Sequence, residues 1–166
     1  LETTCTAGAY QKGSQLFIVD AITGELYWSA SGSNAGTPAP TLTVAGMDYS
    51  IPSQPKVMDI NADGLADTIY IGDLGGQVFR ADINNGQPKE TLVKRVKLIA
   101  KFGASVSTTA GDDRRFYEPP TVAMFRDETL KQNFAAVALG TGNRSYPLNT
   151  VVSDRFVTIF GYDVAR

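Results

Sequence analysis

The sequence predicts an all-β protein built from short antiparallel sheets, and three observations favour this class. Pro, Gly, Thr, Asn and Ser recur along the chain, and no long stretch rich in Ala, Glu, Lys and Leu indicates an extended helix. The hydrophobic fraction of 43% is ordinary for a globular protein with a sizeable core. Three segments also share one rhythm, in which an apolar run, a polar turn or loop and a second apolar run follow one another.

The first of these segments covers residues 15–29 and predicts a hairpin. Its first apolar run ends at Asp20, a Thr-Gly-Glu turn follows, and an aromatic run then reaches Trp28. Gly24 supplies the positive φ that a tight turn between twisted strands requires. We expect Trp28 to pack as a structural residue of this hairpin.

The second segment predicts another hairpin, with strands at 69–71 and 78–81 and a turn at 74–76. In the third segment, the run 135–142 and the run 155–163 predict two strands joined by a polar loop. The strands share an ending in which an aromatic residue is followed closely by Asp.

Between these segments the sequence is rich in turn residues. Residues 104–120 form a long polar stretch, and we expect the charged run 112–115 within it to be a solvated loop. Residues 140–145 are glycine-rich, but they lack the lysine and the following helix of a phosphate loop, so we interpret them as a turn. We interpret the glycine-rich residues 72–76 as a hairpin turn and not as a dinucleotide-binding fingerprint. The only expected helix is a short piece at 127–133.

Repetition of a short antiparallel sheet is how β-propellers are built, and the commonest repeat has four-stranded blades of around 40–45 residues. On that scale the 166 residues hold roughly three to four blades, which is too few to close most rings. We therefore interpret 1–166 as a single segment of a propeller, with blade-like units at approximately 13–50, 51–100 and 117–166. Since the chain starts at Leu1 and not at Met, we expect it to be a piece of a longer protein.

The composition argues against several classes of function. The formal net charge of −2 indicates no general attraction to nucleic acid or to an anionic membrane. The chain contains no histidine, the commonest general base, so we expect no enzyme activity. Cys5 is the only cysteine, which excludes an internal disulfide and a thiolate zinc site. No apolar run approaches the roughly 18 residues of a membrane span.

The residues with the most specific chemistry lie in one tight loop at 59–67. Oxygen-bearing side chains stand at positions 1, 3, 5 and 9 of this loop: Asp59, Asn61, Asp63 and Asp67. Calcium takes six to eight hard oxygen ligands, and side chains on alternate residues of a curled loop point inward together. Gly64 at position 6 permits the sharp turn, and the backbone carbonyl of Leu65 at position 7 is a further ligand.

The loop departs from a helix–loop–helix calcium hand at position 12, where Tyr70 replaces the bidentate glutamate and a strand signal follows. Asp67 then has to supply the closing carboxylate. Three carboxylates in nine residues repel one another, so a cation is expected to order the loop. The alternative is a set of Asx-turns in which the side chains cap their own backbone. Magnesium fits less well, because it prefers octahedral geometry and retains water.

The run 57–82, which contains this loop and the hairpin after it, resembles the C-terminal propeller of PilY/PilC-type pilus proteins. These are type IV pilus tip-associated adhesins and biogenesis factors. Two further stretches are similar to that family: 20–28 looks like the quinoprotein-type blade before the calcium loop, and 138–144 with 154–156 looks like the blade after it.

The resemblance implies a quinoprotein-like β-propeller on a secreted protein at the pilus tip, the outer membrane or the periplasm. It implies a Ca²⁺ site that controls pilus extension against retraction, and with it twitching motility and surface attachment. The implied partners are pilus components, namely minor pilins, and a host or abiotic surface. Carried over to this chain, the ligands are Asp59, Asn61, Asp63, the Leu65 carbonyl and Asp67.

Two other functions remain open on the sequence. An integrin-like calcium-binding propeller repeat of another secreted adhesin uses a similar loop, but several such loops on successive blades would favour it, and this chain has one. A non-catalytic relative of the quinone-dependent dehydrogenases is suggested by the Thr-Gly-Glu turn and Trp28, although such enzymes usually place adjacent cysteines beside the cofactor. A dockerin is poorly supported, because it needs paired calcium loops leading into helices.

Overall fold

The computed structural model describes residues 13–33, 38–103 and 109–163. Within these ranges the chain forms ten strands in three sheets, together with two 3₁₀ helices of three residues each, η1 (Lys89–Thr91) and η2 (Ala110–Asp112). The all-β class predicted from the sequence is therefore confirmed. No helix in the described ranges is long and apolar enough to cross a bilayer. Cys5 lies outside the described residues.

The first sheet contains three strands in the order β1-β2-β3: Gln15–Val19, Leu26–Ser31 and Leu42–Thr43. β1 and β2 form the predicted antiparallel hairpin, and the short β3 runs parallel to β2. The Asp20 carboxylate accepts the Thr23 N–H at 2.7 Å and so closes the hairpin turn, in which Gly24 has a φ of +74°. Trp28 is buried, as expected of a structural residue.

The second sheet has four antiparallel strands in the order β4-β5-β6-β7: Lys56–Met58, Thr68–Gly72, Gln77–Ile83 and Val93–Lys101. The hairpin predicted at 69–81 is β5-β6, in which Tyr70 lies opposite Arg80. Its turn is held by the buried Asp73 carboxylate, which accepts the N–H groups of Gly75 at 2.9 Å and Gln77 at 2.8 Å.

The third sheet has the order β10-β9-β8, with the strands in chain order at Thr121–Asp127, Gln132–Gly140 and Phe156–Gly161. The strand pair predicted from the third segment is β9-β10, in which Phe156 lies opposite Gly140 and Gly161 lies opposite Ala135. The two strands are antiparallel, and so are β8 and β9, the other pair of this sheet.

The helix expected at 127–133 is wrong, because Asp127 ends β8, residues 128–131 form the turn of the β8-β9 hairpin, and Gln132 begins β9. The Asp127 carboxylate accepts the N–H groups of Thr129 and Leu130, both at 2.9 Å, which is a local Asx-type cap that competes with a helix. Lys131 has a φ of 54°, which reverses the chain into β9.

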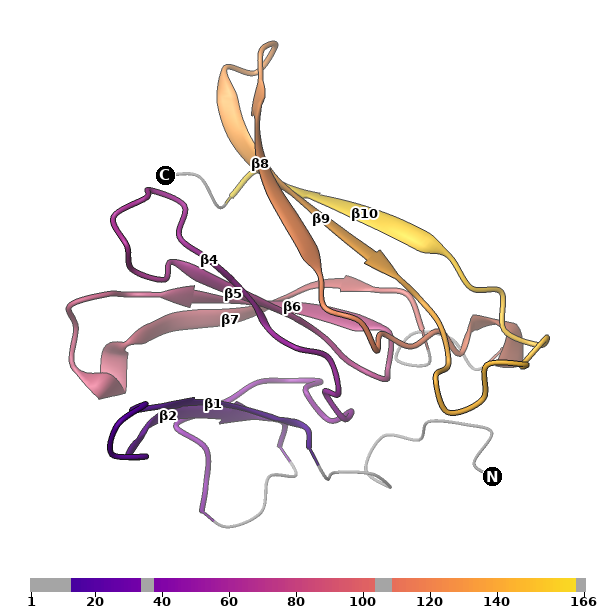
Figure 1. Ribbon diagram of the computed structural model, residues 1–166, viewed down its shortest axis with the longest axis horizontal. Helices are drawn as coiled ribbons and strands as arrows, with labels where there is room; N and C mark the ends of the chain where they lie inside the picture. The colour runs from indigo at the N-terminus through magenta and orange to yellow at the C-terminus, as the bar shows by residue number, and fades with distance from the viewer. Residues whose placement is uncertain (1–12, 34–37, 104–108, 164–166) are drawn as a thin grey trace.

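The three sheets follow one another through space in chain order, with the second sheet between the other two (Figure 1). One apolar core joins the first sheet to the second, and its main buried members are Leu16, Trp28, Met47, Ile69, Ile71 and Phe79. Another joins the second sheet to the third: Tyr70, Val78, Phe116, Val122, Val137 and Leu139. Alternate residues of a strand point to opposite faces, so β5 contributes to both cores and all five of its residues are buried.

Candidate metal centre

The predicted ligand loop connects β4 to β5 and is fastened to the second sheet at both ends. The Asp67 N–H donates to the Met58 carbonyl at 2.8 Å, which closes the neck of the loop. The Asp67 carbonyl in turn accepts the Ile83 N–H at 2.8 Å, at the end of β6. The Asn85 side-chain amide donates to the Ala66 carbonyl at 2.6 Å. The sheet therefore fixes where the loop begins and ends.

Within the loop, each predicted side-chain ligand accepts a backbone N–H of the loop itself. The Asp59 carboxylate accepts from Ala62 at 2.7 Å and from Gly64 at 2.8 Å. The Asn61 side-chain oxygen accepts the Asp63 N–H at 2.9 Å, and the Asp63 carboxylate accepts the Leu65 N–H at 2.8 Å. The Asp67 carboxylate accepts the Ile60 N–H at 2.6 Å. The structure therefore contains the Asx-turns that the sequence offered as an alternative, and all four predicted ligand side chains belong to one hydrogen-bonded loop.

The backbone of the loop turns sharply at two positions. Gly64 has a φ of +88°, as the turn at position 6 requires, and Ala62 has a φ of 61°. A left-handed conformation costs a residue with a Cβ roughly 1–2 kcal/mol, so the surrounding hydrogen bonds have to hold Ala62 in place.

The chemistry of the donors fits calcium, since three carboxylates, one amide oxygen and one carbonyl are hard oxygen ligands. A carboxylate has about four lone-pair sites, so acceptance of one or two N–H groups leaves capacity for a cation. In the described part of the chain, however, no three acidic, cysteine or histidine side chains converge into a ready-made metal cluster. The structure thus places the predicted ligands in one loop without drawing their carboxylates to a common point.

A cavity of about 260 Å³ borders the loop and extends toward the third sheet. Asn61 and Asp67 line it from the loop side, and Asp82, Arg95 and Asp163 line it from the other side. The acidic loop is therefore next to a second set of charged side chains.

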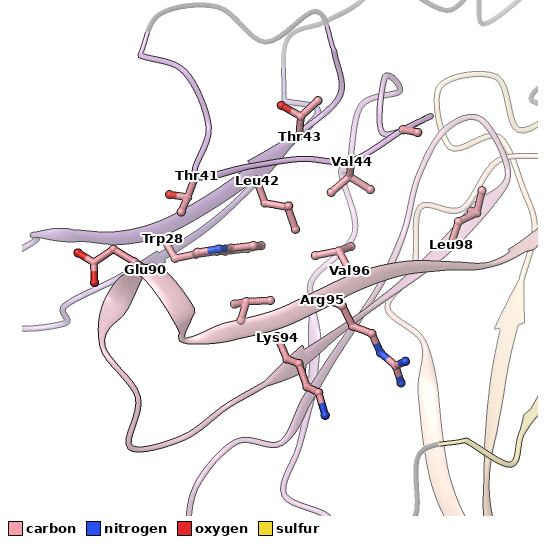
Figure 2. Close-up of a pocket in the computed structure, with 12 residues that line it drawn as sticks. Trp28, Thr41, Leu42, Thr43, Val44, Glu90, Lys94, Arg95, Val96 and Leu98 are labelled. Atoms are coloured by element: carbon pink, nitrogen blue, oxygen red, sulfur yellow. The ribbon is translucent and has the colours of Figure 1, made fainter.

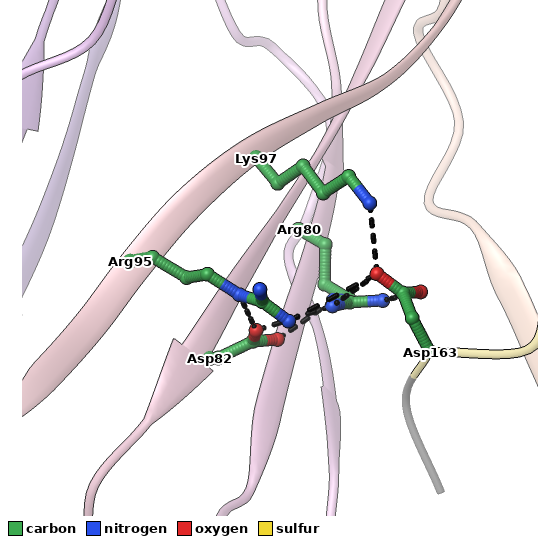
Figure 3. A network of polar contacts seen from close by, with 5 residues as sticks. All are labelled: Arg80, Asp82, Arg95, Lys97 and Asp163. Atoms are coloured by element: carbon green, nitrogen blue, oxygen red, sulfur yellow. Dashed lines mark hydrogen bonds and ion pairs between the residues drawn. The ribbon is translucent and has the colours of Figure 1, made fainter.

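That second set is an ion-pair network around Arg80, which is 1% exposed (Figure 3). The Arg80 guanidinium donates to the carboxylate of Asp82 at 2.6 Å and to that of Asp163 at 2.7 Å. Lys97 also contacts Asp163, at 2.8 Å, and Arg95 contacts Asp82. Because Asp163 follows β10 and Arg80 lies in β6, the network connects the third sheet to the second.

The network shifts the pKa values of Asp163 and Arg80 in the direction of their charged forms. Hydrogen bonds from Arg80 and Lys97 hold the pKa of the Asp163 carboxyl well below its usual range. Burial lowers the pKa of Arg80, but its hydrogen bonds to Asp163 and Asp82 outweigh the burial and raise it overall. The sequence reasoning missed this network. The feature of the sequence that could have indicated the network is Arg80 itself, a single cation in the largely apolar strand β6. A buried arginine is almost always paired with an acidic group.

The charged run 112–115 is not the solvated loop that the sequence predicted. Asp113, Arg114 and Arg115 are buried, at 6–8% exposure. The Arg114 guanidinium donates to the carbonyls of Ser153 at 2.7 Å and Phe102 at 3.0 Å, so it fastens this segment to its neighbours. The arginine fork can satisfy several carbonyls at once, and this makes burial of the run possible.

A larger cavity of about 390 Å³ lies between the first and second sheets (Figure 2). Its apolar walls come from both sheets: Trp28, Leu42, Val44, Val93, Val96 and Leu98. The side chains of Lys94 and Arg95 point away from Trp28 (Figure 2). None of the predicted metal ligands lines this cavity, which is therefore separate from the acidic loop.

The fold and the site define an all-β protein of stacked sheets that carries an Asp- and Asn-rich loop between two strands of its middle sheet. No protein-family profile matches the chain, and no curated protein sequence matches it. Among solved structures, the C-terminal domain of PilY1 from Pseudomonas aeruginosa is similar, with a TM-score of 0.51 and 23% sequence identity. The similar region covers 90% of this chain and 31% of that chain. At this identity the similarity shows a shared fold, and this chain spans about a third of the PilY1 structure.

Proposed function

We propose that the chain is a calcium-binding, non-enzymatic module of a type IV pilus tip-associated adhesin. The observation that carries the proposal is the 59–67 loop, in which four oxygen-bearing side chains on alternate positions are held in one hydrogen-bonded turn. The fold shared with the PilY1 C-terminal domain supports the assignment to a pilus protein. The absence of histidine from the sequence supports a binding role and not a catalytic one.

In this proposal Asp59, Asn61, Asp63 and Asp67 hold the ion through their side chains, and Leu65 holds it through its carbonyl. Bound calcium supplies two positive charges that offset the repulsion among the three carboxylates. Asp67 has a double role, because its backbone also joins the loop to β4 and to the end of β6. Calcium binding that orders the loop therefore also restrains the β5-β6 hairpin of the second sheet.

The regulatory part of the proposal follows from that connection. A loop that is ordered with calcium and looser without it changes the edge of the middle sheet, while the two cores keep the sheets together. Such a change at the pilus tip would bias extension against retraction, and with it twitching motility and surface attachment. The proposed location is the bacterial surface, at the pilus tip, in the outer membrane or in the periplasm, in contact with minor pilins.

The test is a calorimetric titration of the chelator-stripped protein with calcium, with magnesium as the competing ion. We expect one calcium site per chain, and we expect Asp63→Ala to abolish it because the change removes a carboxylate ligand. Asp154→Ala is the matched control, since it removes an exposed carboxylate from another loop, and it should bind calcium like the parent. Absence of calcium heat in the parent, or unchanged binding in Asp63→Ala, would reduce the loop to a set of capped turns.

A further inference from the structure

The peptide group between Ala66 and Asp67 is held from both of its sides. Its N–H, which belongs to Asp67, donates to the Met58 carbonyl of β4 at 2.8 Å. Its carbonyl, which belongs to Ala66, accepts the side-chain amide of Asn85 at 2.6 Å. A trans peptide group is planar, so two hydrogen bonds on its opposite sides fix the orientation of the whole plane. The direction in which the Asp67 side chain leaves the backbone is therefore set by these two contacts.

Asn85 differs from the other groups that hold the Asp67 backbone. The carbonyl of Asp67 itself accepts the Ile83 N–H at 2.8 Å, so three hydrogen bonds in all converge on this point of the chain. Two of the three use backbone groups of the second sheet, which no substitution removes cleanly. The third uses the Asn85 side chain, and it can be removed by a single substitution.

The Asn85 amide reaches the loop from the connection between β6 and β7, which is itself closed by hydrogen bonds. Asn85 lies 19 residues along the chain from Ala66 and is partly buried. Next to it, the Asn84 N–H donates to the Leu92 carbonyl at 2.6 Å, across the connection. Gly86 follows with a φ of +77°, which glycine adopts without the steric cost of a Cβ. A closed turn therefore presents the amide to the loop.

The chemistry of the contact requires an amide at this position. The Ala66 carbonyl is an acceptor and needs a donor opposite it. The amide of Asn donates two hydrogens, whereas the ionised carboxylate of Asp, which has the same shape, only accepts. An Asp at position 85 would place oxygen against oxygen. The size of the side chain alone therefore does not satisfy the contact.

The contact bears on the proposed ion because Asp67 supplies the closing carboxylate of the calcium site. That carboxylate also accepts the Ile60 N–H at 2.6 Å, so its position fixes the beginning of the loop as well as the end. Groups that hydrogen-bond behind a metal ligand orient it, and their loss typically lowers metal affinity by roughly 10–100-fold.

We propose that Asn85 is a positioning residue of the calcium site, and that it holds the Asp67 ligand in place through the Ala66 carbonyl. The inference rests on the proposed function, because Asp67 is a ligand only in a loop that binds calcium. It assigns part of the calcium affinity to a residue outside the 59–67 loop, in a connection that the spacing of the ligands does not reveal. Calcium in the loop and order in the β6-β7 connection then stabilise each other, as linkage requires.

Calorimetric titration with calcium measures the role in two variants and a matched control. Asn85→Ala removes the donor, and Asn85→Asp replaces it with an acceptor of the same shape. Asn84→Ala is the control, because Asn84 is the exposed neighbour in the same connection and its amide donates to the Thr91 carbonyl at 3.4 Å. We expect the calcium dissociation constant to rise by about 10-fold or more in both Asn85 variants and to stay at the parent value in Asn84→Ala.

The Asn85→Asp variant separates positioning from simple electrostatics. Its added negative charge would by itself strengthen the binding of a cation. Weaker calcium binding by this variant therefore reports the lost hydrogen bond, whereas binding as tight as that of the parent, or tighter, would overturn the inference.

Hydrogen exchange of the calcium-free protein shows whether the effect is local. In Asn85→Ala the amides of residues 59–67 should exchange faster than in the parent, while those of β5 and β6 keep their rates. A merely structural loss would speed exchange throughout the second sheet. Exchange in the loop that matches that of Asn84→Ala, or a rise that extends over the whole sheet, would overturn the inference. Circular dichroism establishes that each variant folds.

The failure of the inference and the failure of the proposed function give different results. A parent that binds no calcium overturns the proposed function, and this inference with it. A parent that binds calcium no more tightly than Asn85→Ala overturns the inference alone and leaves the calcium site in place.

Discussion

Arg80 is a cation in the interior of the stack, and its two carboxylate partners come from different parts of the chain. Asp82 lies two residues away on the same strand, whereas Asp163 lies 83 residues away. Transfer of a charge from water into a protein interior costs several kcal/mol unless paired groups offset it. The pair with Asp163 therefore matters for more than its own hydrogen bond, because it connects β6 to the end of β10.

We expect Asp82→Asn to destabilise the protein by about 2–4 kcal/mol, since the change leaves the buried Arg80 with only Asp163 as a full counter-charge. Urea unfolding at neutral pH measures the loss. Glu128→Gln is the control, because the ion pair between Glu128 and Lys131 is about 70% exposed on both sides and contributes less than about 1 kcal/mol. Equal effects of the two changes would show that Arg80 has no special need of Asp82.

Individual residues were predictable where the signal is local. The acceptors of the 59–67 loop follow from their alternate spacing, and the structure places all four in one turn. The burial of Arg114 was not predictable in this way. Asp112, two residues away, is one acceptor, but the carbonyls of Phe102 and Ser153 lie 12 and 39 residues away and leave no signal in the local sequence.

Among the elements, the β1-β2 and β5-β6 hairpins were predicted correctly, and the β8-β9 hairpin was missed. The β1-β2 turn contains Gly24 and the β5-β6 turn contains Gly76, both with positive φ. The β8-β9 turn uses Lys131 for the same purpose, with a φ of 54°. A charged residue in a polar run gives no sign of a left-handed conformation, so the sequence suggested a short helix there instead.

That turn allows a stabilising change. Lys131→Gly should raise the free energy of unfolding by about 0.5–1 kcal/mol, because glycine adopts positive φ without the steric penalty of a Cβ. A rise in the midpoint of thermal or urea unfolding measures it. Leu130→Gly, one residue earlier and without a positive φ, should instead lower stability, since glycine there only adds freedom to the unfolded chain. If both changes destabilised the protein alike, the strain assigned to Lys131 would be absent.

At the scale of the whole molecule, three segments meet at the β5-β6 turn. The Leu74 N–H donates to the Ser50 carbonyl at 2.9 Å, and the Phe116 N–H donates to the Asp73 carbonyl at 3.0 Å. The Gln77 side-chain amide donates to the Gly46 carbonyl at 2.7 Å. The sequence indicated a hairpin turn here, but it contained no sign that the same turn joins the chain beyond the first sheet to the chain before the third. Such contacts depend on how the sheets stack, and the stacking cannot be predicted from the local conformational preferences of the residues.

The Asp73 carboxyl at this junction is fully buried, and burial raises its pKa to about 7. Hydrogen bonds from the N–H groups of Gln77 and Gly75 oppose the rise without cancelling it. In the unfolded chain the same carboxyl has a pKa near 3.8. Between these two values the folded protein holds a proton that the unfolded chain has released, so this group makes stability fall as the pH rises from about 4 to about 7, and it adds no further slope above that.

We therefore expect the free energy of unfolding to contain a component from Asp73 that decreases by up to ~1.4 kcal/mol per pH unit across this window. Asp73→Asn removes the titration and keeps the shape of the side chain. The difference in stability between parent and variant should then change with pH below about 7 and level off above it, as measured by urea unfolding at a series of pH values. A difference that stayed constant from pH 4 to pH 8 would mean that Asp73 ionises in the folded protein as it does in the unfolded chain. The junction of the three segments would then not be sensitive to pH through this carboxyl.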